Sequence, residues 1–272
     1  MSLNNQNHYT YINNKTVPIV FIHGVGLDSK MWAPQINYFK GYSTITYDLL
    51  GHGKTPFKKE EIKMKDYVEQ LLSLTELLGV NKFHLVGFSL GSLIALNFAA
   101  DFQKKLNSLT LIATTYKRTE NQRKEVIDRV NLAKLNKPIS QLALKRWFTE
   151  MYLKKNPKIY EEFIKILTKN TRDQQNFIKA YELFAYYNDD IEMIKKINTK
   201  TFFPTTIIVH KKGECFYTIN ALNKLIESEV GLEKGNINYK EHEIDWDKYQ
   251  GKMLIVKNGN LVIMDINRNF SE

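Results

Sequence analysis

The chain has 272 residues, is 43% hydrophobic and carries a formal net charge of +10, so it can bury a large core and is neither disordered nor collagen-like. Its single cysteine, Cys215, cannot form an internal disulfide, and no Cys/His cluster has the spacing of a zinc site, which indicates a reducing compartment and no bound metal. No segment resembles a signal peptide or a membrane span, so we expect a cytoplasmic protein that does not associate with a membrane.

The first hundred residues alternate between strand-like and helix-like patterns, which is typical of a parallel sheet joined by crossover helices. Short apolar runs that end at turn residues predict strands over Val17–Ile22, Ser43–Asp48, Lys82–Gly87 and Leu106–Ala113. Helical spacing predicts helices over Met64–Leu78 and Gly91–Asp101. We therefore expect residues 1–115 to form the first part of an α/β core.

Residues 116–197 show only helical periods and are predicted to form a cap. The expected helices cover 118–135, 139–152, 158–168, 172–187 and 189–196. Strand character returns at Thr205–Val209, within the last and atypical part of the core, residues 198–272. An all-helical block between two strands of one sheet indicates an insertion that covers the sheet.

The cap carries nearly all of the excess positive charge. Between Lys117 and Lys179 there are 16 Lys and Arg residues against 7 Asp and Glu residues, a local balance of +9. Such a surface favours anionic partners, of which a small acidic substrate or an acyl carrier is one interpretation and a solvated lysine-rich face the other. Nucleic acid is not expected as a partner, because no basic run alternates with stacking aromatic residues.

The motif Gly87-Phe88-Ser89-Leu90-Gly91 lies between a predicted strand and a predicted helix. In this context a G-x-S-x-G sequence forms a sharp, strained turn that exposes the serine hydroxyl above the sheet. The start of the helix adds free N–H groups where negative charge would develop on a substrate. The other interpretation is a serine that caps a helix within a glycine turn.

A second glycine-containing motif, His23-Gly24-Val25-Gly26, follows the first buried strand. Its glycines allow the backbone to approach a substrate closely. We expect the N–H groups of Val25 and Leu90 to form an oxyanion hole, and His23 to hold the loop rather than to act as a base.

These motifs together resemble those of the α/β-hydrolase superfamily, in the order Phe21–Gly24, Tyr47–Thr55, Gly87–Ser92 and a helical cap. The resemblance implies an α/β-hydrolase fold, with a mostly parallel sheet flanked by helices and an inserted helical cap. It also implies Ser89 as nucleophile, Val25 and Leu90 as oxyanion donors, and no cofactor. Asp48 and His52 correspond to positions that shape a turn in this family.

Lys145–Glu150, followed by Lys155-Asn156-Pro157, resembles the cap of the 3-oxoadipate enol-lactonase-like branch. Members of that branch hydrolyse small lactones or esters that bear a carboxylate. The resemblance therefore implies a small anionic substrate, in agreement with the charge of the cap.

From about residue 200 the chain departs from the family pattern. Gly213 occupies the position of the triad aspartate, and Glu214, one residue later, is either the triad acid or a solvated turn residue. Asn260 stands where the triad histidine is expected, and its amide cannot accept and return a proton. The dipeptide Asn258-Gly259 instead predicts a β-hairpin between Met253–Val256 and Leu261–Met264.

Two histidines after the cap remain as candidate bases. His242 is the preferred one and His210 the second; the alternative interpretation for both is an ordinary strand residue. With a working base, the chain is expected to be a serine hydrolase that acts on a small carboxylic ester, lactone or thioester through an acyl-enzyme at Ser89. Without one, it would be a catalytically impaired relative that binds a ligand or a partner. The aromatic residues expected either to line a pocket or to fill the cap core are Trp147, Tyr181, Phe184 and Tyr187.

Overall fold

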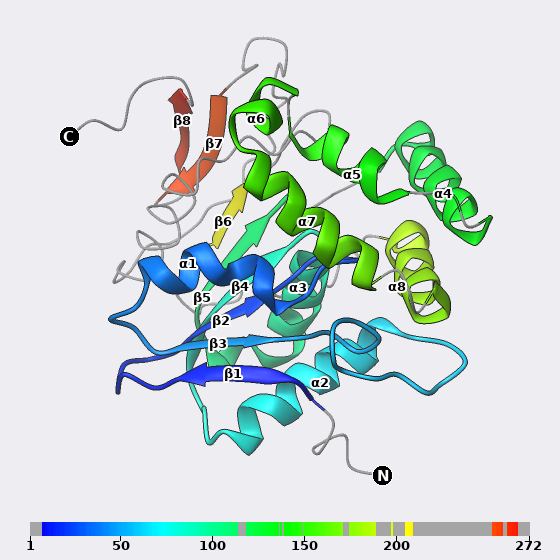
Figure 1. Cartoon of the computed structure of the whole chain (residues 1–272). Coiled ribbons are helices and arrows are strands. Elements are labelled where there is room, and N and C mark those ends of the chain that lie inside the picture. The colour runs from blue at the N-terminus through cyan, green and yellow to red at the C-terminus, as the bar shows by residue number, and fades with distance from the viewer. Residues whose placement is uncertain are drawn as a thin grey trace.

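The computed structural model describes residues 7–113, 118–135, 137, 139–148, 150–170, 174–188, 197, 205–208, 252–257 and 260–265. These residues form one six-stranded sheet with helices on both faces, a group of cap helices and a two-stranded hairpin (Figure 1). Among them, no helix is long and apolar enough to cross a membrane.

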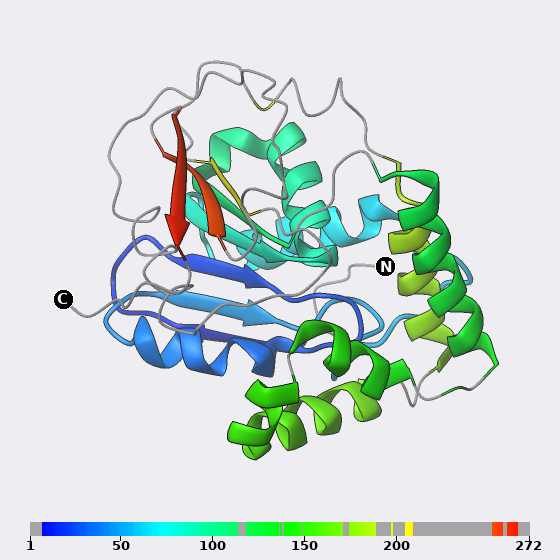
Figure 2. The ribbon, with the colours of Figure 1, turned by 90° about the horizontal axis from the view of Figure 1, so that it is seen from above.

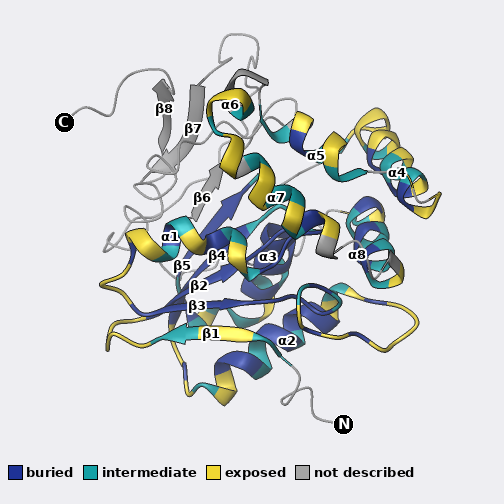
Figure 3. Ribbon diagram, viewed as in Figure 1, coloured by how far each residue is buried: buried dark blue, intermediate teal, exposed yellow. Residues whose placement is uncertain are grey.

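The sheet is parallel except for its first strand. Its order is β1 (Tyr9–Ile12), β3 (Thr44–Tyr47), β2 (Ile19–Ile22), β4 (Phe83–Phe88), β5 (Leu106–Ile112) and β6 (Thr205–Ile208), with β1 antiparallel to β3. Every residue of β2 is buried (Figure 3). Such apolar strands are expected where helices cover both faces of a parallel sheet.

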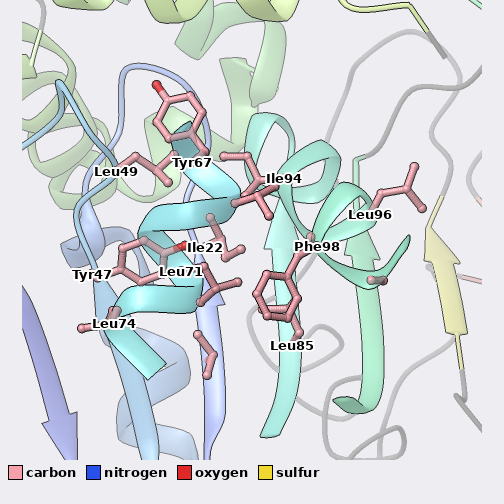
Figure 4. Packing of buried hydrophobic residues seen from close by; sticks show 14 of the residues in the cluster. Ile22, Tyr47, Leu49, Tyr67, Leu71, Leu74, Leu85, Ile94, Leu96 and Phe98 are labelled. Carbon is pink, nitrogen blue, oxygen red and sulfur yellow. The ribbon is translucent and has the colours of Figure 1, made fainter. Parts of the chain in front are cut away.

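Side chains of β2 alternate between the two faces of the sheet and therefore pack against different helices. Phe21 contacts the rings of Trp32 and Phe39, beside a 3-10 turn (Ser29–Trp32) and α1 (Ala33–Tyr38). Ile22 lies in the larger core on the other face, against α2 (Met64–Leu77) and α3 (Leu90–Phe102) (Figures 2 and 4). A second 3-10 turn, Gln103–Lys105, leads from α3 to β5.

The cap lies beyond the carboxyl ends of the parallel strands (Figure 2). Its helices are α4 (Glu120–Lys134), α5 (Ile139–Trp147), α6 (Glu150–Lys155), α7 (Pro157–Asn170) and α8 (Gln174–Tyr186). The single helix expected over 139–152 is therefore two, interrupted at Phe148, whose side chain packs into an apolar cluster with Leu144. The helix expected over 189–196 lies outside the described residues, and the domain boundaries near 115 and 197 stay predictions.

Helix α8 is attached to the core by side-chain hydrogen bonds. The Asn97 amide of α3 donates to the Tyr187 hydroxyl at 2.9 Å, just after α8 ends. Near the start of α8, the Asn176 amide donates to the carbonyl oxygen of Phe57 at 3.1 Å. Both ends of this cap helix are thus fixed relative to the sheet.

The hairpin predicted from Asn258-Gly259 is confirmed. Strands β7 (Lys252–Lys257) and β8 (Asn260–Asp265) are antiparallel, and Lys257 pairs with Asn260. Strand β7 lies beside β6 without joining its sheet (Figure 1). Asn260 therefore begins a hairpin strand, as its sequence context indicates.

Candidate active site

Ser89 occupies a strained turn between β4 and α3. Its backbone has φ 54° and ψ −115°, a conformation that residues other than glycine rarely adopt. Its N–H donates to the Ile112 carbonyl of β5 at 2.9 Å, which holds the turn to the sheet. The residue is partly exposed and serves as the N-cap of α3. This is the geometry that a G-x-S-x-G sequence predicts at the end of a strand.

Two glycines of this motif are required by the close approach of backbone atoms. A β-carbon on Gly91 would overlap the carbonyl oxygens of Ile22 and His23, and one on Gly87 would overlap the carbonyl of Gly91. Neither clash can be relieved by a side-chain rotation, because the opposing atoms belong to the backbone. The glycine spacing thus allows α3 to start directly beside the end of β2.

The loop after β2 lies next to Ser89. A β-carbon on Gly24 would be 3.2 Å from the Ser89 β-carbon and 2.9 Å from the Phe88 ring. Within the described part of the chain, the N–H groups of Val25 and Leu90 have no hydrogen-bond acceptor, and Leu90 is the first residue of α3. One of these amides thus follows Gly24 in the loop that adjoins Ser89, and the other directly follows Ser89 in the chain.

A pocket extends from this loop into the cap. Its lining comprises Val25, Arg129, Ile139, Ser140, Leu142, Ala143, Trp147, Leu167, Phe177 and Tyr181. Trp147 and Tyr181 thus line the pocket, as one interpretation of the sequence expected. Phe184 and Tyr187 do not belong to this lining. The Phe184 ring centroid lies 4.2 Å from the Arg118 Cζ atom, and the Tyr187 hydroxyl accepts a hydrogen bond from Asn97. Arg129 was not singled out from the sequence, because nothing in its helical pattern distinguishes it from other cations of α4.

His23 is buried beneath the loop and holds it, as predicted. Its Nδ1 lies 2.8 Å from the Gly24 carbonyl oxygen, and its Nε2 accepts a hydrogen bond from the Leu49 N–H at 2.9 Å. This pairing requires the neutral tautomer with the proton on Nδ1. Burial lowers the pKa of His23 below its usual value, which also favours the neutral ring.

The other three described histidines also have partners away from Ser89. The Nδ1 of His52 lies 3.1 Å from the Leu50 carbonyl oxygen, and burial together with nearby His23 lowers its pKa to about 3. The Nδ1 of His84 lies 2.8 Å from the Ser108 hydroxyl, and burial lowers its pKa to about 4. The Nδ1 of His8 is 3.0 Å from a carboxylate oxygen of Asp48. None of these histidines is bonded to the Ser89 hydroxyl.

Glu214, His210 and His242 lie outside the described residues, so the predicted triad acid and base stay predictions. The described residues contain no group of three or more His, Cys, Asp or Glu side chains that could hold a metal ion.

Asp48 shapes a turn, in agreement with the sequence analysis. Its carboxylate accepts hydrogen bonds from the N–H of Ser29 at 2.9 Å and the N–H of Lys54 at 2.8 Å. Burial acts to raise the pKa of Asp48, but the bonds from Ser29 and Lys54 outweigh it and leave the pKa below its usual value. Asp48 thus fixes two loops at the end of the sheet.

Comparison with known proteins identifies the family. Residues 17–228 match the family model described as alpha/beta hydrolase fold. The chain is 30% identical over 183 residues to an (E)-2-((N-methylformamido)methylene)succinate hydrolase of Acinetobacter baylyi, over 67% of this chain and 68% of that protein. It is 27% identical over 161 residues to 3-oxoadipate enol-lactonase 2 of the same organism, over 57% and 59% of the two chains. The second match thus spans less than two thirds of the lactonase.

Solved structures confirm the predicted fold. The enol-lactonase from Burkholderia xenovorans LB400 superposes with a TM-score of 0.68 and 16% identity, over 82% of this chain and 96% of that one. The chain therefore belongs to the α/β-hydrolase fold family, as a hydrolase-type enzyme that resembles the enol-lactonases.

Proposed function

We propose that the chain hydrolyses a small carboxylic ester, lactone or thioester through an acyl-enzyme formed at Ser89. The observation that carries this proposal is the position of Ser89, on a strained turn near the N–H groups of Val25 and Leu90, which have no acceptor among the described residues. These are the parts that acyl transfer to serine requires, apart from a base.

In the proposed reaction, the Ser89 oxygen attacks the carbonyl carbon while its proton passes to a histidine base. The oxyanion that forms accepts hydrogen bonds from the N–H groups of Val25 and Leu90, each of which contributes about 10² to 10³ in rate. The tetrahedral intermediate then expels the alcohol or thiol, which takes the proton from the histidine. Water hydrolyses the acyl-enzyme by the same steps, and the carboxylic acid is released.

We assign the base to His242 and the acid to Glu214. The four described histidines support this choice by elimination, because His23, His52 and His84 are hydrogen-bonded to groups other than Ser89 and His8 lies beside Asp48. Of the remaining two, His242 is preferred over His210 on the sequence pattern. No cofactor is needed for this chemistry.

We propose a small substrate that carries a carboxylate. The relatives include a hydrolase named for a succinate derivative and lactonases named for 3-oxoadipate, and both names denote derivatives of dicarboxylic acids. The local charge of +9 between Lys117 and Lys179 is consistent with an anionic ligand. The single cysteine supports a cytoplasmic location.

Covalent labelling with a fluorophosphonate probe tests the mechanism. We expect rapid labelling of the wild type, none of Ser89→Ala, and slow labelling of His242→Ala, with Ser92→Ala as the matched serine control. Fast labelling of His242→Ala but slow labelling of His210→Ala would move the base to His210. If the wild type is not labelled, the acyl-enzyme proposal is wrong.

A second candidate function is ligand binding without efficient catalysis. It is favoured by Asn260, which begins a hairpin strand at the position expected for the triad histidine. A protein without its base would retain about 10³- to 10⁴-fold acceleration over water from the remaining site. Slow ester turnover therefore fits both candidates, whereas the labelling rate of Ser89 separates them.

A further inference from the structure

The described lining of the pocket beneath the cap includes a charged side chain, that of Arg129. Among the described residues that line it, Arg129 is the only one that carries a charge, and most of the others are apolar or aromatic. Arg129 lies on α4, and Tyr181, which lines the same pocket, lies on α8. An arginine in such surroundings keeps its charge, so the pocket has a fixed positive site.

Other cations of α4 have protein partners. Lys124 forms an ion pair with Asp128 at 2.7 Å, Lys134 forms one with Glu182, and Arg123 donates to two backbone carbonyls at the end of α8. Arg129 differs from them. In the described part of the chain it pairs with no carboxylate, and its only hydrogen bond is from Nε to the Tyr181 hydroxyl, at 3.1 Å.

Within the described part of the chain, the two terminal nitrogens of the Arg129 guanidinium have no hydrogen-bond partner. A guanidinium has five N–H donors in a planar fork, and the Nε–H is the one that Tyr181 accepts. The fork matches the two oxygens of a carboxylate, and charge-assisted bonds of this kind are stronger when apolar walls exclude water. Tyr181 also contacts the Phe177 ring, which restricts its orientation and with it that of Arg129.

The same pocket reaches the loop after β2, which adjoins Ser89. Val25 is part of the pocket lining, and Gly24, which precedes it, lies beside the Ser89 β-carbon. A short acyl chain whose carbonyl is at Ser89 would therefore extend into the pocket that contains Arg129.

We propose that Arg129 binds the carboxylate of the substrate and that Tyr181 is its positioning residue, so that the enzyme selects half-esters or lactones of short dicarboxylic acids over neutral esters. This inference rests on the proposed function, because it concerns the ligand of the same site. It explains why Arg129, a basic residue on the pocket side of α4, has no acidic partner among the residues that the structure describes.

Paired substrates of similar size test the selectivity. The anionic substrate is mono-p-nitrophenyl glutarate, and the neutral one is p-nitrophenyl butyrate. We expect Arg129→Gln to lower kcat/KM for the anionic ester by about 10- to 100-fold, mainly through KM, since a bond to a charged group contributes about 1.5–3 kcal/mol and each 1.4 kcal/mol is tenfold. For the neutral ester, kcat/KM should change by less than about threefold. Arg129→Lys should retain part of the preference.

Two further variants separate specificity from structure. Tyr181→Phe removes the acceptor from Arg129 and should raise KM for the anionic ester several-fold, with a smaller effect on KM for the neutral ester. Lys124→Gln removes the same unit of charge from the exposed side of α4 and should leave kcat/KM for both esters unchanged. Equal losses on both esters in Arg129→Gln and Tyr181→Phe, with a lowered Tm, would show that the pair only joins α4 to α8 and would overturn the proposal.

A binding measurement keeps this inference separate from the proposed reaction. Glutarate is titrated into Ser89→Ala by calorimetry, with glutaramide as the neutral probe, and then into Ser89→Ala combined with Arg129→Gln. We expect Ser89→Ala to bind glutarate but not glutaramide, and the double variant to bind neither. If the wild type hydrolyses neither ester but this binding pattern holds, the reaction is wrong and the carboxylate site stands. Equal binding to both proteins, or none to Ser89→Ala, overturns the site.

Discussion

A β-carbon on Gly24 would lie 3.2 Å from the Ser89 β-carbon, so the loop after β2 and the turn after β4 touch each other. Gly24→Ala must therefore displace one of these segments by a few tenths of an ångström. Because an error of about 1 Å in a catalytic group costs about 10² in rate, we expect roughly a tenfold loss in kcat/KM for p-nitrophenyl acetate.

Gly41→Ala is the matched control for Gly24→Ala. A β-carbon on Gly41 would meet no atom within 4 Å, so this variant should keep full activity. An unchanged kcat/KM in Gly24→Ala would mean that the loop and the serine move independently.

The backbone strain at Ser89 predicts an unusual stability change. At φ 54° and ψ −115° a glycine is favoured, so Ser89→Gly should be more stable than Ser89→Ala by about 1–3 kcal/mol. Ser92, one turn into α3, gives the opposite control: there Gly should be less stable than Ala by about 1 kcal/mol. Urea denaturation of the four variants measures both differences, and the same order at both positions would contradict the strain.

Asp48 is expected to matter for stability through its loop bonds. Asp48→Asn retains the shape but replaces one carboxylate oxygen by an N–H₂ group, so one of the Ser29 and Lys54 amides loses its acceptor. The two bonds are partly buried, so the loss of one should cost up to about 1–3 kcal/mol and lower the midpoint of urea denaturation. Asp101→Asn, on an exposed residue of α3, is the control and should be neutral.

His52 predicts a loss of stability in acid. Its pKa is lowered from 6.5 to about 3 in the folded protein, mainly by burial, so the unfolded chain binds more protons between these values. The contribution of His52 to the free energy of unfolding is therefore complete above about pH 6.5 and is lost as the pH decreases toward 3. This loss amounts to about 2 kcal/mol between about pH 7 and about pH 5. His52→Asn, which keeps a side-chain N–H donor but does not titrate, should reduce this difference. Urea titrations at both pH values measure it, and an unchanged difference would exclude His52 as its source.

The central sheet could be predicted from sequence because its strands are marked by local patterns. The buried strand β2 and the Gly87–Gly91 motif are each a short contiguous run of residues. The structure places both as expected. The edge strand β1 was missed, since it is partly exposed and lacks a regular apolar alternation. Helix α1 was also missed, although Asp28 caps the 3-10 turn before it and Pro34 lies in its first turn.

The site could be predicted only as far as it is built from neighbouring residues. Ser89, Leu90 and Val25 come from two short motifs, and the turn and loop that contain them adjoin each other in the structure. The pairing of Arg129 with Tyr181 joins residues on two cap helices, and their relative orientation depends on tertiary packing that periodicity does not contain. The base could not be assigned for a different reason: the sequence pattern predicts a histidine at the position of Asn260, and Asn260 begins a hairpin strand.

The loop from Gly24 to Gly26 is held between the serine turn and the cap. On the cap side, a β-carbon on Gly26 would lie 3.1 Å from the Phe177 ring and 3.5 Å from Leu167. Phe177 and Leu167 also line the pocket, so redesign at either residue would disturb turnover as well as substrate choice, whereas redesign at Arg129 would alter mainly which acids are accepted. Laboratory evolution toward new esters should accordingly collect its first useful substitutions on α4 and reject most of those that face the loop.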